Sequence, residues 1–258
     1  MYLRRKSCLS QKLAPQKTKR LVPKRDKLIE NSMTYLVRIL ALVSMSSMLT
    51  MSASAKTIIE SVPFTITKAG TYVLDGDLTL SGTNQTGITV NASNVVIDLA
   101  GFTLTTSDTT LANFGITVSS TATNVTIQNG TITGFGAGVR LLGAQELAQN
   151  LRLLSAGTGV YAASSCTASV VQNCFIAGPG NNNGVLLDGC RDVVVKNNQI
   201  LFEVTGGNSA GNNSFIANYI GNCQVGLSMS ATDKYQANVT NTCETPFVGG
   251  TAVGDENN

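Results

Sequence analysis

The 258-residue sequence contains neither histidine nor tryptophan, and only 13% of its residues are charged. Without histidine, no imidazole base can activate a serine or cysteine nucleophile, and no imidazole can ligate a metal ion. The side chain that most often transfers protons near neutral pH is missing as well. Histidine-based catalytic triads, Cys–His pairs and histidine metal sites are therefore excluded.

The charge is divided unevenly along the chain, although the formal net charge is only +3. Residues 1–32 hold ten Lys or Arg against two Asp or Glu, whereas residues 56–258 hold seven against thirteen. All 25 glycines follow residue 55, and five of the six methionines precede it. The composition separates a leader from an acidic body that has no basic patch, so we expect no nucleic-acid partner.

The stretch from Met33 to Ala55 has the pattern of a signal peptide. Arg38 supplies a positive N-terminal region, an apolar run follows, and Ala53-Ser54-Ala55 is a small-x-small cleavage site. The run is short and interrupted by serine, which disfavours a membrane span in the mature chain. The sequence therefore predicts a secreted or periplasmic protein. The basic segment 1–32 is predicted to be untranslated, with Met33 as the true start, or to be a disordered tail.

An internal repeat dominates the body of the chain, residues 56–258, and its copies recur at intervals of about 22 residues. A glycine followed by an apolar–x–apolar triplet marks each copy. The copies are Gly87-Ile88-Thr89-Val90, Gly115-Ile116-Thr117-Val118, Gly138-Val139-Arg140-Leu141, Gly159-Val160-Tyr161-Ala162, Gly184-Val185-Leu186-Leu187 and Gly226-Leu227-Ser228-Met229. Short β-branched runs alternate with Gly, Asn and Ser turns between these copies. Because long helical periodicity is missing, the helix-based repeat classes do not fit.

Such a repeat predicts a solenoid of parallel β coils, about six to eight in number. One coil cannot bury its own apolar face, but coils stacked roughly 4.8 Å apart pair every strand with its neighbour. Side chains alternate along a strand, so the apolar positions of each triplet should face inward and the middle position outward. The outward row is Thr89, Thr117, Arg140, Tyr161, Leu186 and Ser228. Asparagines after the second strand, such as Asn198 and Asn218, are expected to stack in hydrogen-bonded ladders.

Three segments resemble secreted right-handed parallel β-helix proteins of the pectin-lyase-like superfamily. They are FTITKAGTYVL (residues 64–74), NVVIDLAGFTL (residues 94–104) and DGCRDVVVKNNQI (residues 188–200). The resemblance covers about residues 57–250 and implies an all-β, single-stranded right-handed parallel β-helix. Members of that superfamily include polysaccharide lyases, glycoside hydrolases, epimerases, phage tailspikes and non-catalytic surface proteins, so the resemblance does not assign one function.

By this resemblance, a site would lie on the outward face of one sheet. Arg140 beside Tyr161 offers a cation next to an aromatic ring, which suits a sugar ring and a uronate carboxylate. A lyase of this type needs a Lys or Arg base and carboxylates that hold Ca²⁺, whereas a hydrolase needs converging carboxylates. The candidates for catalysis are Arg140, Asp188 and Asp192. A turn separates Asp188 from Asp192, and Asp98 lies several coils away.

Two functions remain open. The protein recognises, or processes as a polysaccharide lyase or glycoside hydrolase, an extracellular polysaccharide; alternatively, it is a non-catalytic adhesin-like or scaffold protein. The connections between coils are short, so there is little material to wall a deep cleft. We expect no cofactor, except Ca²⁺ if the protein is a lyase. The C-terminal coil has no amphipathic cap, which predicts a monomer or an end-to-end oligomer.

The body also holds five cysteines. Aligning the repeats places Cys166 and Cys190 in the same column of adjacent coils, near bridging distance. Cys223 and Cys243 form a looser second pair, and Cys174 is left over. Disulfides are one interpretation, and buried core thiols are the other. No metal site is expected, because there is no C-x-x-C spacing and no histidine to complete one.

Overall fold

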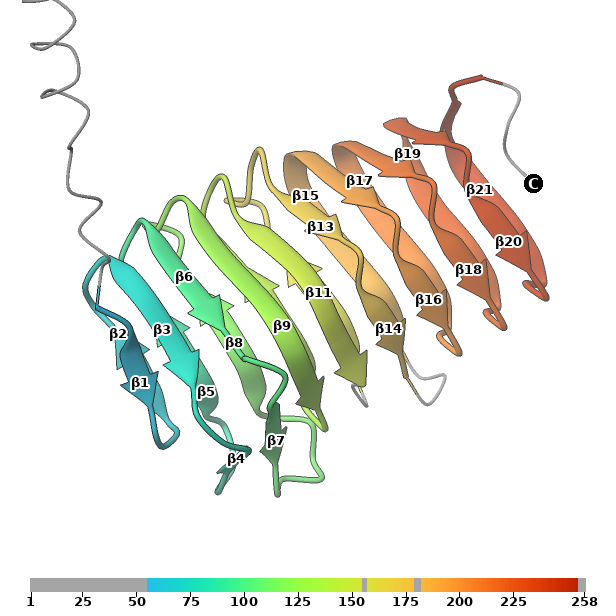
Figure 1. Ribbon diagram of the computed structural model, residues 1–258. Coiled ribbons are helices and arrows are strands. Elements are labelled where there is room, and N and C mark those ends of the chain that lie inside the picture. Colours follow the sequence, from blue (N-terminus) through green and yellow to red (C-terminus); the bar gives the residue numbers. More distant parts are fainter. Residues whose placement is uncertain (1–54, 155–156, 179–181, 255–258) are drawn as a thin grey trace, which may run out of the picture. The chain divides into compact units, whose positions relative to one another are not determined.

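The computed structural model describes residues 55–154, 157–178 and 182–254, which contain 21 β-strands and no helix. Figure 1 shows these strands in successive coils from β1 (blue) to β21 (red). The strands are β1 (Thr57–Ile59), β2 (Phe64–Ile66), β3 (Gly70–Leu74), β4 (Leu78–Leu80), β5 (Thr86–Val90), β6 (Val95–Asp98), β7 (Thr103–Thr106), β8 (Phe114–Val118), β9 (Val125–Thr133), β10 (Ala137–Leu141), β11 (Leu147–Leu154), β12 (Thr158–Ala162), β13 (Val170–Gln172), β14 (Phe175–Ala177), β15 (Asn183–Lys196), β16 (Gln199–Leu201), β17 (Thr205–Ile216), β18 (Tyr219–Gly221), β19 (Val225–Gln236), β20 (Val239–Asn241) and β21 (Thr245–Ala252).

The coils build three parallel sheets, which we call faces A, B and C. Face A contains β2, β5, β8, β10, β12 and the first parts of β15, β17, β19 and β21. Face B contains β1, β3, β6, β13, the first parts of β9 and β11, and the second parts of β15, β17, β19 and β21. Face C contains β4, β7, β14, β16, β18, β20 and the second parts of β9 and β11. The predicted right-handed parallel β-helix is confirmed.

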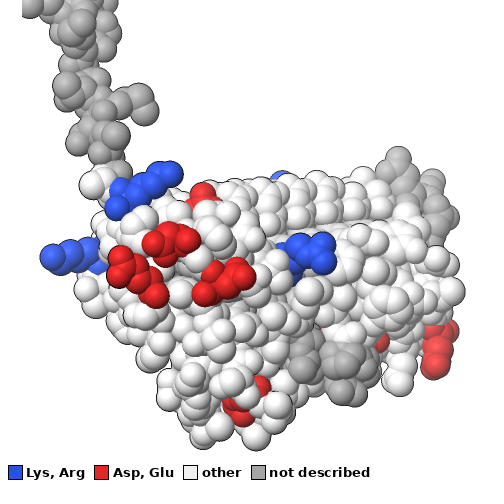
Figure 2. All heavy atoms as spheres, turned by 60° about the horizontal axis from the view of Figure 1, so that its bottom comes forward, with Lys and Arg blue, Asp and Glu red and all other residues white. Residues whose placement is uncertain are grey.

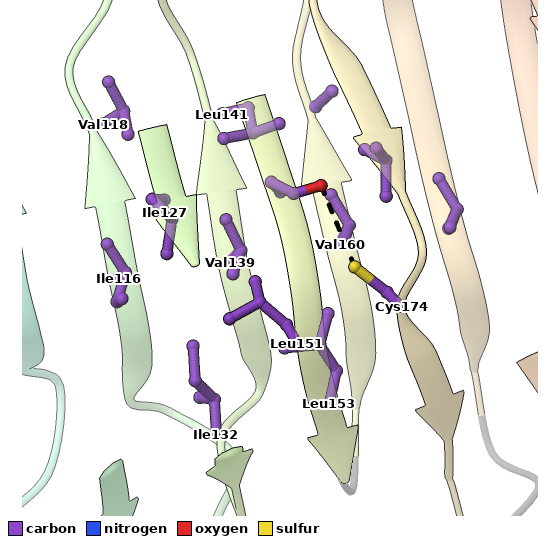
Figure 3. Packing of buried hydrophobic residues seen from close by; sticks show 14 of the residues in the cluster. Ile116, Val118, Ile127, Ile132, Val139, Leu141, Leu151, Leu153, Val160 and Cys174 are labelled. Carbon is purple, nitrogen blue, oxygen red and sulfur yellow. Dashed lines mark hydrogen bonds between the residues drawn. The ribbon is translucent and has the colours of Figure 1, made fainter. Parts of the chain in front are cut away.

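The core consists of the inward rows that the triplets predict. The fully buried members on face A are Ile88, Val90, Ile116, Val118, Val139, Leu141, Val160, Ala162, Val185, Leu187 and Leu227, and Met229 is 7% exposed. Figure 3 shows how Ile116, Val139 and Val160 stack from coil to coil, with Leu151 and Leu153 packed alongside. Burying each Val, Leu or Ile side chain stabilises the fold by about 1.5–3 kcal/mol. One apolar core therefore runs through all the coils.

The glycine at the head of each triplet points inward, where the next coil leaves no room for a side chain. A Cβ on Gly115 would lie 2.4 Å from the carbonyl oxygen of Gly138. The consecutive residues Gly115 and Ile116 are therefore both buried, which breaks the usual alternation along a strand. Phe114, the residue before them, turns outward and is only half-buried. This local irregularity explains why glycine recurs, and it decides which side chains reach the outer surface of face A.

Buried asparagines form the predicted ladder at the turn that precedes face C. Asn198, Asn218 and Asn238 are 2%, 1% and 0% exposed. The backbone N–H of Asn218 donates to Oδ1 of Asn238 (3.0 Å), and Nδ2 of Asn218 donates to the carbonyl of Val195 (2.9 Å). The N–H of Cys174 donates to Oδ1 of Asn198 (2.9 Å). The amides thus satisfy backbone groups that would otherwise be buried without a partner.

The coils become regular toward the C-terminal end of the stack. Gln199, Tyr219 and Val239 are register partners on face C, so the sequence separation between partners is the same at each step. Face A has the same separation there, as Thr205, Val225 and Thr245 show. In contrast, the interval between the partners Thr86 and Phe114 in the N-terminal coils is longer. In the regular coils, residues at equal positions of the repeat therefore stack in columns.

The predicted basic segment 1–32 and the predicted signal peptide, from Met33 to Ala55, lie outside the described residues except for Ala55. Among the residues that the structure describes, no helix is long and apolar enough to cross a membrane. In the view of Figure 2, acidic side chains gather near the N-terminal coils, and most of the surface carries no charge.

Candidate functional site

The outward row of face A brings the predicted pair Arg140 and Tyr161 together. Arg140 on β10 is the register partner of Thr117 on β8 and of Tyr161 on β12. Both members of the pair are half-buried. Thr117 was expected to face solvent, but it is only 9% exposed. Neighbouring coils are about 4.8 Å apart, so the large side chain of Arg140 stacks closely beside it.

Arg140 lies between two aromatic rings. Its Cζ is 4.2 Å from the ring centroid of Phe114 and 5.8 Å from that of Tyr161. Its Nε is buried and has no hydrogen-bond partner among the described residues. Cation–π contacts of this kind contribute about 0.5–1 kcal/mol each at exposed sites. The two rings thus hold the guanidinium in place, and its Nε–H has no hydrogen-bond acceptor among the described residues. We call Phe114, Arg140 and Tyr161 the Arg140 patch.

Asp188 lies at the edge of the Arg140 patch. The hydroxyl of Tyr161 donates to Oδ2 of Asp188 at 3.3 Å. Burial, and then the neighbouring Asp188 carboxylate, raise the pKa of Tyr161. The phenol therefore stays protonated at neutral pH and keeps its role as a hydrogen-bond donor to the carboxylate.

The other acidic candidates lie away from the patch: Asp98 ends β6 on face B, and Asp192 lies at the corner between faces A and B. Asp192 has a left-handed backbone (φ 57°), and its Oδ1 accepts a hydrogen bond from Nδ2 of Asn212 (3.2 Å). Oδ1 of Asp98 accepts from the N–H of Ala100 (2.9 Å) and from Nδ2 of Asn129 (3.2 Å). Asp98 thus holds its turn, as aspartate commonly does, whereas Asp192 is hydrogen-bonded to a side chain of the next coil. Of the acidic candidates, Asp188 is the one that contacts the patch, through the hydroxyl of Tyr161.

A fixed loop, residues 107–113, leads directly into Phe114. Asn113 is fully buried, and its Nδ2 donates to the carbonyl of Gly82 (2.6 Å) while its Oδ1 accepts from the N–H of Gln85 (2.8 Å). Oδ1 of Asp108 accepts from both the N–H and the hydroxyl of Thr110, and these bonds lower the pKa of Asp108. The loop is therefore tied to the preceding coil, which fixes the position of the Phe114 ring.

Phe114 was not among the residues predicted from the sequence. The available signal was its place directly before the glycine of a triplet, where the strand turns a side chain outward. Two buried carboxylates, Glu146 and Glu203, were missed as well. Oε1 of Glu146 accepts from the N–H of Gly143 (2.9 Å), and burial raises its pKa to about 7.

Glu203 follows β16 at the corner between faces C and A and is 3% exposed. Neither of its carboxylate oxygens has a hydrogen-bond partner among the described residues. Burial raises the pKa of Glu203 to about 8. A Cβ added to Gly178, in the preceding coil, would lie 2.5 Å from the carboxylate. The glycine therefore leaves the space that this side chain fills.

The members of each predicted cysteine pair occupy equal positions in neighbouring coils, and all four thiols are free in this structure. Thr167 bridges to Arg191, and the N–H of Arg191 donates to the carbonyl of Cys166 (3.3 Å), so Cys166 stacks on Cys190. Cys174 is separate. Its thiol points into the core and contacts the carbonyl oxygen of Ala148 at 3.8 Å (Figure 3).

The described residues contain no group of three or more His, Cys, Asp or Glu side chains that could hold a metal ion. Burial also raises the thiol pKa to about 12 in Cys166 and to about 11 in Cys174 and Cys190. These thiols are therefore protonated at neutral pH, whereas the thiolate is the form that binds metals.

A family model described as NosD, periplasmic copper-binding protein, matches residues 50–257. Among solved structures, ORF18 of Geobacillus virus E2 is 14% identical over 71% of this chain, with a TM-score of 0.41, and this chain spans 52% of it. The A-module of the mannuronan C-5 epimerase AlgE4 of Azotobacter vinelandii is 11% identical, with a TM-score of 0.38, over 79% of this chain and 86% of that one. Pectate lyase Pel9A is 15% identical, with a TM-score of 0.37, over 75% and 70%. No curated protein matches the chain.

Proposed function

The chain belongs to the NosD family of periplasmic copper-binding proteins, and from this premise we propose that it acts in the periplasm or outside the cell, where it binds an acidic polysaccharide on face A. The proposal assigns no site to the copper that the family description names. The sequence has no histidine, and the described part of the chain has no cluster of three metal-binding side chains. Copper sites in proteins rest on imidazole, thiolate and thioether ligands brought close together.

The observation that carries the proposal is the environment of Arg140. Its guanidinium is held by the rings of Phe114 and Tyr161, and its buried Nε has no partner among the described residues. A uronate carboxylate can accept charge-assisted hydrogen bonds from such a guanidinium, and the apolar face of a sugar can rest on the aromatic rings. An anionic sugar unit would meet the solvent-facing part of the half-buried Arg140 side chain and the edge of the rings, while the buried Nε lies out of its reach.

The same geometry favours binding over hydrolysis. Hydrolysis of a glycosidic bond needs two carboxyl groups about 5–10 Å apart, with the substrate between them. Asp188 is the one acidic candidate at the patch and already accepts the hydroxyl of Tyr161. Asp192, the second candidate, lies at the corner between faces A and B and is hydrogen-bonded to Asn212 of the next coil. We therefore assign recognition to the patch and no hydrolytic step.

The test is a binding assay with the full chain and soluble polysaccharides, both acidic (polygalacturonate, alginate) and neutral (dextran). Binding is measured by calorimetry with and without Ca²⁺, while ultraviolet absorbance and reducing-end assays report cleavage. We expect binding of an acidic polymer without cleavage. Arg140→Ala should weaken it about tenfold or more, because losing one charge-assisted bond costs about 1.5–3 kcal/mol.

Arg152→Ala is the matched control. Arg152 also lies over an aromatic ring, with its Cζ 5.2 Å from the centroid of Phe175, but it is on face C. Its replacement should leave the affinity unchanged. Equal losses in both variants, or equal binding of dextran, would refute the assignment of the site. Cleavage lost in Arg140→Ala would establish an enzyme instead, and no binding at all would favour the non-catalytic scaffold.

A further inference from the structure

The corner between faces C and A carries a column of three ionisable side chains in the last regular coils: Glu203, Cys223 and Cys243. They follow β16, β18 and β20 respectively. The flanking register is continuous, since Gly221 pairs with Asn241 before the corner and β19 pairs with β21 after it. Cys223 and Cys243 therefore occupy the same position in neighbouring coils.

The backbone holds these two cysteines at the spacing of adjacent coils. The N–H of Glu244 donates to the carbonyl of Cys223 (3.2 Å), and the N–H of Asn222 donates to the carbonyl of Asn241 (3.0 Å). In-register coils lie about 4.8 Å apart, which is within the usual Cα separation of about 4.4–6.8 Å for a disulfide. Burial, and then the neighbouring Cys243 thiol, raise the pKa of Cys223, which indicates that the two thiols lie near each other. A covalent bond therefore needs no large backbone movement.

The Cys223–Cys243 pair is more accessible to solvent than the Cys166–Cys190 pair. Cys243 is half-buried in the last coil, whereas Cys166 and Cys190 are 0% exposed in the middle of the stack. The thiol of Cys166 contacts Oε2 of Glu146 (3.6 Å). An oxidant in solution can reach Cys243 directly, but it can reach Cys166 or Cys190 only after a coil has opened.

From this arrangement we propose that Cys223 and Cys243 are a selective oxidation site, and that they form a disulfide that joins the last two coils of the β-helix. The oxidant is a small disulfide such as oxidised glutathione. The Cys243 thiolate attacks one of its sulfur atoms and displaces one glutathione thiolate, which gives a mixed disulfide. The Cys223 thiolate then displaces the second glutathione thiolate. The two thiol protons end on the two glutathione molecules, so two cysteines are oxidised and one disulfide is reduced.

Burial raises the pKa of Cys223 to about 11, so few of its thiols are ionised at neutral pH. This supports the order of the two steps, in which the more exposed Cys243 attacks first. Once in the mixed disulfide, Cys243 presents its sulfur to Cys223 at close range, and the second step is intramolecular. The resulting bond ties the outermost coil to its neighbour.

The experiment equilibrates the reduced full chain with oxidised glutathione, quenches with acid, alkylates the remaining thiols and maps the peptides without reduction. We expect a peptide pair linked through Cys223 and Cys243, with the loss of two hydrogen atoms in mass, while Cys166, Cys174 and Cys190 are alkylated. Cys8, outside the described residues, is followed separately in the same map. Cys243→Ser should abolish the link, and Cys166→Ser should leave it unchanged.

Limited proteolysis gives a second readout, because the oxidised chain should lose its last coil more slowly than the reduced one. Alkylation of both Cys223 and Cys243 after equilibration would overturn the proposal. So would a Cys166–Cys190 link that forms first. If Cys243→Ser does not fold, the peptide map of the unaltered chain still decides between these outcomes.

Discussion

Replacing Glu203 by Gln should stabilise the protein at neutral and alkaline pH and change little in acid. The carboxylate is 3% exposed, without a hydrogen-bond partner among the described residues, and burial raises its pKa from 4.5 to about 8. The folded state therefore binds the proton more tightly than the unfolded chain does. The stability that the protonated carboxyl supplies is complete below pH 4.5 and is lost as the pH rises through 8.

The expected magnitude follows from the size of the pKa shift. Between pH 4.5 and 7, a carboxyl group with a folded-state pKa near 8 loses about 3 kcal/mol of stability relative to its protonated form. Water that enters locally around the carboxylate reduces this loss of stability. We therefore expect Glu203→Gln to raise the free energy of unfolding by on the order of 2 kcal/mol at pH 7. At pH 4.5 the two proteins should agree closely, since both then carry a neutral side chain at this position.

The assay is urea denaturation of both proteins at pH 4.5, 7 and 8.5, followed by circular dichroism. Glu244→Gln is the matched control, because Glu244 directly follows Cys243 at the same corner and is exposed. It should leave the difference between acid and neutral pH unchanged. A Glu203→Gln protein that is equally stable or less stable at pH 8.5 would show that the carboxylate is satisfied at this corner, and the reasoning would fail.

Asn218→Ala should destabilise the protein by about 3 kcal/mol, because it removes several buried hydrogen bonds of the Asn218 side chain at once. A fall in the urea midpoint that corresponds to less than about 1 kcal/mol would contradict the ladder's role. Gly159→Ala should also destabilise, by about 1–3 kcal/mol, because the new Cβ would lie 2.4 Å from Ile176 and 2.7 Å from the carbonyl of Gly184. Gly76→Ala, with nothing within 4 Å, is its control in thermal melts, and equal losses in the two variants would refute the steric argument.

The fold could be predicted from the sequence because one coil is specified locally and then repeated. The inward positions of the triplets, such as Val139 and Val160, are fully buried as predicted. Their alternation follows from strand geometry alone, and every coil carries that information again. The ladder at Asn198 and Asn218 was predicted for the same reason, since stacked coils align equal positions.

The site was only partly predictable, because it depends on departures from the repeat. Register placed Arg140 beside Tyr161, but Phe114 joins them only because the glycine after it makes the strand irregular. Glu203 was missed because a buried carboxylate breaks the pattern of its column, in which the later coils have Cys223 and Cys243. A single sequence gives no sign that such a carboxylate turns inward.

The constant spacing of the last coils has a consequence for how such a chain can change length. Gln199, Tyr219 and Val239 are register partners at equal sequence intervals. One interval of the sequence therefore forms one complete coil, and the next coil starts directly beside the start of the previous one. Duplication or deletion of the codons for a single coil in this part of the gene would therefore add or remove one coil of the β-helix. The asparagine ladder and the buried aliphatic rows would stay aligned on both sides of the change. The regular part of the protein can therefore evolve by changing its number of coils.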